Sequence, residues 1–129
     1  MYLFVLRDYQ EGVLISLPSV IKRVPCDNVT HWRFRDITVN EGLPFGIPAP
    51  LLEERSRISP DGVCVSTEEF GEFLKTDSQI IDGCIYGLSG ANARTSLFCL
   101  DCVDASQWEA TTEYESIANE LEKHGWSRQ

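Results

Sequence analysis

The chain has no long apolar run and little basic charge. No stretch approaches the roughly 18 consecutive apolar residues that a membrane-spanning helix needs. The apolar start, residues 2–6, is followed at once by Arg7 and Asp8, and no basic segment precedes it, so it does not resemble a secretory signal peptide. These absences argue against a helical membrane protein and predict a cytoplasmic location.

Cysteine is scarce and its number is odd, which argues against a disulfide framework. The five cysteines are Cys26, Cys64, Cys84, Cys99 and Cys102. Cys99 and Cys102 have the spacing of a metal-binding or redox pair, but the chain has no second such pair and only two histidines. The pair also falls in a predicted strand, where residues three apart point to opposite faces. We therefore expect free thiols, with no metal and no cofactor.

The motifs of the common catalytic sites are also missing. Ser89 and Gly90 miss the Gly-x-Ser-x-Gly pattern of a nucleophile elbow by one residue. The chain has neither a glycine-rich phosphate loop nor an acidic calcium-binding loop. The sequence therefore names no catalytic residue and favours a protein that is not an enzyme.

Acidic charge is abundant and unevenly placed. The chain carries 11 Lys and Arg against 20 Asp and Glu, a net charge of −9. This sign excludes the usual nucleic-acid-binding domain and disfavours an anionic membrane surface. Residues 1–60 contain seven Lys and Arg and seven Asp and Glu, so the whole excess lies in residues 61–129.

This acidic half predicts a surface that binds a basic protein. We expect it to comprise Asp82, Glu109, Glu113, Glu115, Glu120 and Glu122. Aromatic anchors beside it are expected at Tyr86, Trp108 and Trp126. In size, charge and lack of catalytic motifs the chain is similar to the small acidic immunity proteins that neutralise basic bacterial nuclease toxins. That similarity is one of type, and no residue is carried over from it.

A second hypothesis is a small enzyme or ligand-binding protein with an anion site. Residues 29–39 alternate as a strand, with Trp32 and Phe34 on one face and His31, Arg33 and Arg35 on the other. Arginine is well suited to binding carboxylates and phosphates. The following segment, residues 40–62, holds four prolines and three glycines and is expected to form a long loop over these side chains.

The apolar pattern predicts two principal helices, at about residues 66–76 and 112–124. In the first, Ser66 and Glu69 match a capping box. In this motif the serine side chain accepts a hydrogen bond from the backbone amide of the glutamate, and the glutamate side chain accepts one from the backbone amide of the serine. Thr112 and Glu115 repeat this pattern in the second. Gly125 stands where a left-handed residue commonly ends a helix, with the next residue packing back on the last turn.

Short elements fill the rest of a single domain spanning residues 1–129. Strands are expected at residues 2–7, 13–17, 29–39, 96–104 and 107–111, and short helical segments at 17–23 and 51–57. The first two strands should form a hairpin, and Asp82-Gly83 predicts a second tight hairpin, with a bulge at Gly83 as the alternative. The fold class is α+β: a mainly antiparallel sheet with both principal helices on one face. Monomer and homodimer both stay open, because an edge strand can pair across a dimer.

Overall fold

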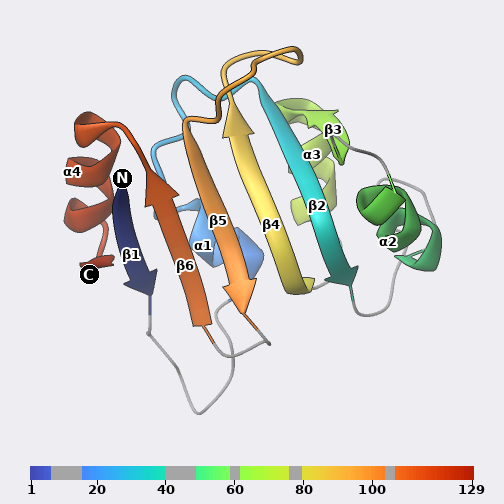
Figure 1. The fold of residues 1–129 in the computed structure, drawn as a ribbon, viewed down its shortest axis with the longest axis horizontal. Helices are drawn as coiled ribbons and strands as arrows, with labels where there is room; N and C mark the ends of the chain where they lie inside the picture. Colours follow the sequence, from blue (N-terminus) through green and yellow to red (C-terminus); the bar gives the residue numbers. More distant parts are fainter. Residues whose placement is uncertain (7–15, 40–48, 59–61, 76–79, 104–106) are drawn as a thin grey trace.

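A computed structural model describes residues 1–6, 16–39, 49–58, 62–75, 80–103 and 107–129. In these residues seven strands form one sheet, accompanied by four helices (Figure 1). The strands are β1 (Tyr2–Leu6), β2 (His31–Val39), β3 (Val63–Ser66), β4 (Ile80–Leu88), β5 (Phe98–Val103), β6 (Gln107–Thr112) and β7 (Ser127–Arg128). The helices are α1 (Leu17–Ile21), α2 (Ala49–Ile58), α3 (Thr67–Leu74) and α4 (Glu115–Lys123). The predicted α+β class is confirmed.

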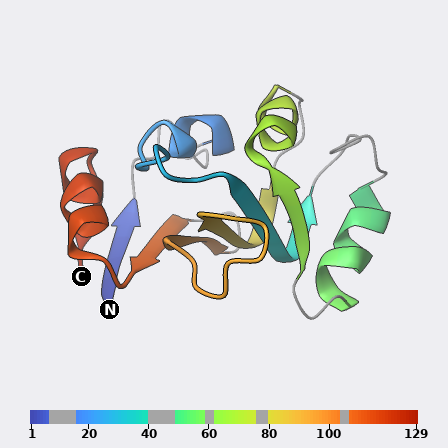
Figure 2. The same cartoon turned by 90° about the horizontal axis from the view of Figure 1, so that it is seen from above.

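The sheet has the strand order β3-β2-β4-β5-β6-β1-β7, and every neighbouring pair is antiparallel. Helices α1 and α3 lie on one side of it, and the loop between β4 and β5 hangs on the other side (Figure 2). Helix α4 lies beside β1, and its buried residues join the same core as α1 and α3. Helix α2 contacts β2 at the opposite end of the sheet. We call the side occupied by α1 and α3 the covered face and the other side the open face.

The covered face holds an aromatic core. Trp32 and Phe34 of β2 point to it, as the alternation predicts, and both are almost completely buried. The ring of Phe70 from α3 stacks on Trp32 with 4.3 Å between ring centroids, and Phe73 meets Phe34 edge to face at 5.9 Å. Phe98 of β5, which β4 separates from β2, meets Trp32 edge to face at 5.8 Å. Burial of these rings fixes which side of each strand faces inward.

Two of the predicted helix signals are confirmed. The Ser66 side chain accepts a hydrogen bond from the Glu69 amide at 3.1 Å, and the Glu69 carboxylate accepts one from the Ser66 amide at 3.2 Å. At the end of α4, Gly125 has a φ of +96°, and the amide of Trp126 donates to the Leu121 carbonyl. This 6→1 bond closes the helix as the glycine predicts.

The second capping box is wrong. Helix α4 begins one residue after Tyr114, which makes no side-chain cap, and Thr112 still belongs to β6. The Thr112 hydroxyl instead donates to the Leu97 carbonyl at 2.8 Å and accepts from the Tyr114 amide. Pairing in the sheet therefore takes precedence over the local helix-start pattern at this residue.

The hairpin at Asp82-Gly83 is also wrong, because residues 80–88 form the single strand β4. The irregularity lies on the opposite strand, where the register with β4 shifts after Arg35 and Asp36 has a φ of +50°. Gly83 has a φ of +126°, and a Cβ there would stand 2.6 Å from the Cα atom of Ile37. The glycine thus allows the backbones of β2 and β4 to approach closely inside the sheet. This irregularity is closer to the predicted bulge than to the predicted hairpin.

The predicted N-terminal hairpin has no counterpart in the described residues. Strand β1 pairs with β6 on one side and with β7 on the other. Residues 13–15 of the expected second strand lie outside the described residues, and Leu17 begins α1. Residues 40–48 and 59–61 of the expected long loop also lie outside them, whereas α2 confirms the short helix expected near residues 51–57.

Candidate functional site

The open face carries polar and charged side chains across its central strands. Alternation along each strand brings them there: Arg33, Arg35, Asp82, Cys84, Tyr86, Cys99, Asp101 and Glu109. Their charges separate along the sheet, because the arginines lie on β2 and the carboxylates on β4, β5 and β6. The arginines can contact an anionic group, and the carboxylates can contact a cationic one.

Three carboxylates form one group on this face, which we call the acidic trio: Asp82, Asp101 and Glu109. Asp101 stands directly opposite Glu109 in the β5–β6 pair and opposite Cys84 in the β4–β5 pair. Asp82 lies two residues before Cys84 and is therefore diagonal to Asp101. Burial raises the pKa of Asp101, a hydrogen bond from Cys84 acts against this rise, and the charges of Glu109 and Asp82 add to it. Within the described residues, no ion pair joins the trio to a cation.

Two thiols and a phenol lie beside the trio. Cys99 is opposite Tyr86, so Cys84 and Cys99 are diagonal neighbours on the same face. A hydrogen bond from Cys99 lowers the pKa of Cys84, and the same contact together with burial raises the pKa of Cys99. Burial and the neighbouring thiols raise the pKa of Tyr86 to about 12. The phenol therefore stays neutral and can donate a hydrogen bond.

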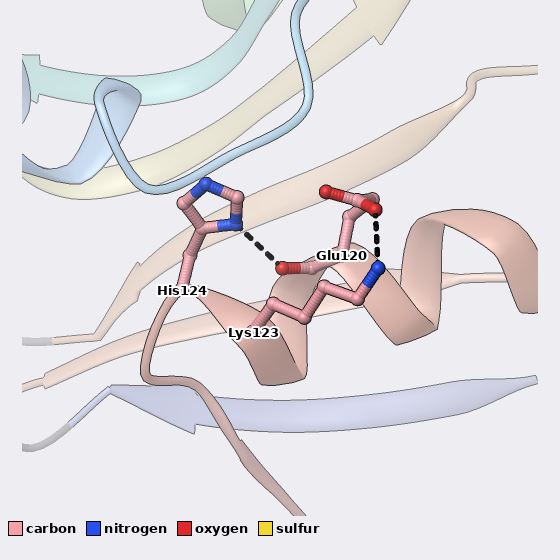
Figure 3. A network of polar contacts seen from close by, with 3 residues as sticks. All are labelled: Glu120, Lys123 and His124. Atoms are coloured by element: carbon pink, nitrogen blue, oxygen red, sulfur yellow. Dashed lines mark hydrogen bonds and ion pairs between the residues drawn. The ribbon is translucent and has the colours of Figure 1, made fainter.

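The remaining predicted acidic residues lie on or just before α4, apart from the trio. Glu113 and Glu115 are exposed at its start, and Glu122 pairs with Arg128. Glu120 lies 3.2 Å from Lys123, and its backbone carbonyl bonds the His124 ring at 2.7 Å (Figure 3). These exposed pairs stabilise the last turn of the helix only weakly. The structure thus divides the predicted acidic surface into two groups.

Only Tyr86 of the three expected anchors lies on the open face. Trp108 is 1% exposed and Trp126 is 3% exposed, so both belong to the core. Trp108 points to the covered face of β6, and the Trp126 indole donates a hydrogen bond to the Arg23 carbonyl at 2.9 Å. Their large apolar area is worth more in the core than on the surface, and the two tryptophans are not available as anchors.

The predicted basic residues all follow the alternation of β2, but they do not act on one site. The His31 ring bonds the Thr30 hydroxyl at 2.9 Å. Arg35 is exposed and lies near Tyr86, and its positive charge acts against the rise in the Tyr86 pKa. Arg33 instead lines a hollow of about 510 Å³ with Arg94 of the β4–β5 loop. Residues 91–94 of the β4–β5 loop line this hollow with Arg33, whereas residues 40–48 and 59–61 of the loop predicted to cover these side chains lie outside the described residues.

Asp101 and Arg94 were not singled out from the sequence. The alternation of β5 gives Asp101 the same side as Cys99, but its neighbours depend on pairing with β4 and β6. Arg94 lies in a loop without periodicity, so no local pattern places it near Arg33. Long-range strand pairing, which single-sequence patterns do not fix, assembles both groups.

Among the described residues, no three His, Cys, Asp or Glu side chains gather in an arrangement that would hold a metal ion. No helix in this part of the chain is long and apolar enough to cross a membrane. Comparisons of the chain with protein-family models, with curated proteins and with solved structures found no match.

Proposed function

We propose that the protein is a cytoplasmic binding module that neutralises a basic protein, and that this partner docks on the open face. The observation that carries the proposal is the acidic trio, three carboxylates held together on a sheet face that α1 and α3 leave open. Like charges side by side on a sheet cost stability. A Lys or Arg side chain of a partner relieves this repulsion and gains a charge-assisted hydrogen bond.

The surroundings of the trio favour a protein partner over a metal ion. The Tyr86 ring lies on the same face, and tyrosine combines apolar area with a hydrogen-bond donor, as interface anchors do. The net charge of −9 speeds the approach of a cationic protein and repels anionic ones. A nuclease toxin, whose active site binds phosphates, is a basic partner of the required class.

The experiment compares two variants that remove the same charge from different places. One carries Asp82→Asn, Asp101→Asn and Glu109→Gln, and the other carries Glu113→Gln, Glu115→Gln and Glu122→Gln near α4. Both serve as baits, beside the unchanged protein, in an extract of the native cell. Bound proteins are identified by mass spectrometry.

The proposal expects a basic protein bound by the unchanged bait and by the α4 variant, and lost from the trio variant. Raising the salt concentration from about 0.05 M to 0.5 M should slow its association by an order of magnitude or more, because screening shortens the reach of the charges. Equal capture by all three baits would refute the assignment of the open face. Loss of capture by the α4 variant alone would refute the open face as the binding site and would indicate that the partner binds at α4.

A further inference from the structure

We propose that the hollow lined by Arg33 and Arg94 is a binding site for a phosphate monoester. This site is separate from the acidic trio and does not rest on the proposed function. The hollow has a volume of about 510 Å³ and lies between β2, β3 and the β4–β5 loop. Its lining residues are Arg33, Cys64, Ala91, Asn92, Ala93 and Arg94.

The charge of the lining defines the class of ligand. Two of the six lining residues are arginines and none is acidic, in a chain with a net charge of −9. Each guanidinium can donate two parallel hydrogen bonds to an oxyanion. Two positive charges match a phosphate monoester, which carries nearly two negative charges at neutral pH. Among the described residues, no ion pair involves either arginine.

Arg33 lines the hollow from β2. It lies on β2, the second strand from one edge of the sheet, between Cys64 of β3 and Tyr86 of β4, and its side chain is half-buried. The Nε atom is buried, and no hydrogen bond to a described residue satisfies it. An unsatisfied buried donor costs free energy, and an anion that accepts from it removes that cost.

Arg94 reaches the same hollow from the loop between β4 and β5. A hydrogen bond from the Ala93 amide to the Gly90 carbonyl closes a turn in this loop, and a bond from the Leu97 amide to the Gly87 carbonyl returns the chain to the sheet. Figure 2 shows the loop on the side of the sheet opposite α1 and α3. Strand and loop thus place two cations around one space from residues 61 positions apart.

The size of the hollow favours a monoester over a free ion. A bare phosphate fills only part of about 510 Å³, which leaves room for the organic group of a small phosphorylated metabolite. The Asn92 side chain and the loop backbone offer further donors around that group. The net charge of the protein repels anions at long range. Binding of a phosphate monoester must therefore come from local contacts inside the hollow.

Titration with inorganic phosphate and with phenyl phosphate, followed by calorimetry or amide chemical shifts, tests the site. Sodium chloride at matched ionic strength and succinate serve as reference anions. We expect one site per chain, tighter binding of phenyl phosphate than of phosphate, and shifts confined to β2, β3 and the β4–β5 loop. Equal effects of chloride would refute the site, and preference for succinate would refute the phosphate class.

Arginine variants assign the contacts. Arg33→Met and Arg94→Met should each weaken phenyl phosphate binding by about tenfold or more, because each removes a charge-assisted pair of hydrogen bonds. Arg35→Met is the matched control, since Arg35 lies on the same face of the same strand but does not line the hollow. A loss with Arg35→Met equal to that with Arg94→Met would overturn the assignment.

Cys64 provides a readout that does not depend on the arginine variants. Its thiol is exposed and lines the hollow. Phenyl phosphate bound there should slow the alkylation of Cys64 by iodoacetamide, measured by peptide mass spectrometry, and leave the rate at Cys84 unchanged. An unchanged rate at Cys64 under saturating phenyl phosphate would place the ligand elsewhere.

Discussion

Replacing Asp101 by asparagine should stabilise the folded protein at neutral pH. The carboxylate faces Glu109 across the β5–β6 pair, with Asp82 on the diagonal, and it is half-buried. Asparagine keeps the shape and an oxygen that can accept the Cys84 hydrogen bond, now 3.7 Å long, while the negative charge is lost. The change therefore isolates the cost of the charge.

The size of the effect follows from the neighbours. A like-charge pair on adjacent strands costs roughly 0.2–1 kcal/mol, and the diagonal neighbour adds less because it is farther away. Solvent screens part of this repulsion, since the side chain is only half-buried. We expect Asp101→Asn to raise the free energy of unfolding by about 0.5–1 kcal/mol at pH 7, which corresponds to about 2–4 °C in Tm.

The gain should depend on pH in one direction. The folded-state pKa of Asp101 is raised, so the folded state disfavours the charged form, first through burial and then through the neighbouring carboxylates. The contribution of this group to stability is therefore fully present below its unfolded pKa of about 3.9 and is lost as the pH rises through the folded pKa. The advantage of the asparagine variant should be greatest at pH 7 and should disappear toward about pH 3.

Urea denaturation is the appropriate assay, because guanidinium chloride is itself a salt and screens the charges. Glu54→Gln is the matched control: it removes one negative charge from an exposed position of α2. It should change stability by less than about 0.5 kcal/mol. A loss of stability with Asp101→Asn, or an equal gain with Glu54→Gln, would refute the repulsion within the trio.

Four further predictions concern the helices, the sheet and the thiols. Ser66→Ala should lower the free energy of unfolding by about 1 kcal/mol in urea, because it removes the capping box of α3, and an unchanged value would deny the cap a role. Gly71→Ala should raise Tm by a few degrees, on the order of 0.5–1 kcal/mol, since the added methyl group has nothing within 4 Å. Gly83→Ala should lower the free energy of unfolding by about 3 kcal/mol or more, because the positive φ and a backbone atom 2.6 Å away exclude a Cβ. Thermal denaturation of both glycine variants should show opposite changes in Tm. Iodoacetamide should modify exposed Cys64 at least about tenfold faster than buried Cys102, and equal rates in peptide mass spectrometry would contradict the assigned faces.

Local chemistry allowed much of the fold to be predicted. The Ser66 capping box, the Gly125 helix end and the alternation through Trp32 and Phe34 each depend on residues a few positions apart. The opposite directions of Cys99 and Cys102 follow from the same alternation: the first is on the open face and the second is buried. Such local signals predict which segments form helices or strands and which side of each faces the core.

Predictions failed where distant contacts decide the outcome. Asp82-Gly83 resembles a hairpin turn, but Gly83 instead fits against the irregular backbone of β2. Thr112 resembles a helix cap, but its hydroxyl bonds the Leu97 carbonyl. Trp108 resembles a surface anchor among acidic residues, but the pairing of β6 turns it to the core. The acidic trio and the Arg33–Arg94 hollow arise in the same way, from segments that meet only in the folded sheet.

The position of β1 determines the order in which the protein can fold during synthesis. This strand lies between β6 and β7, and both of its partners are made long after it, since β6 begins only at Gln107. At 5–20 residues per second, roughly ten seconds pass before β6 emerges. The strands β2 to β5 can pair in that interval, whereas Phe4 and Leu6, both core residues of β1, remain without their sheet. The nascent chain therefore presents an apolar segment to chaperones or to other chains until β6 and β7 have been made.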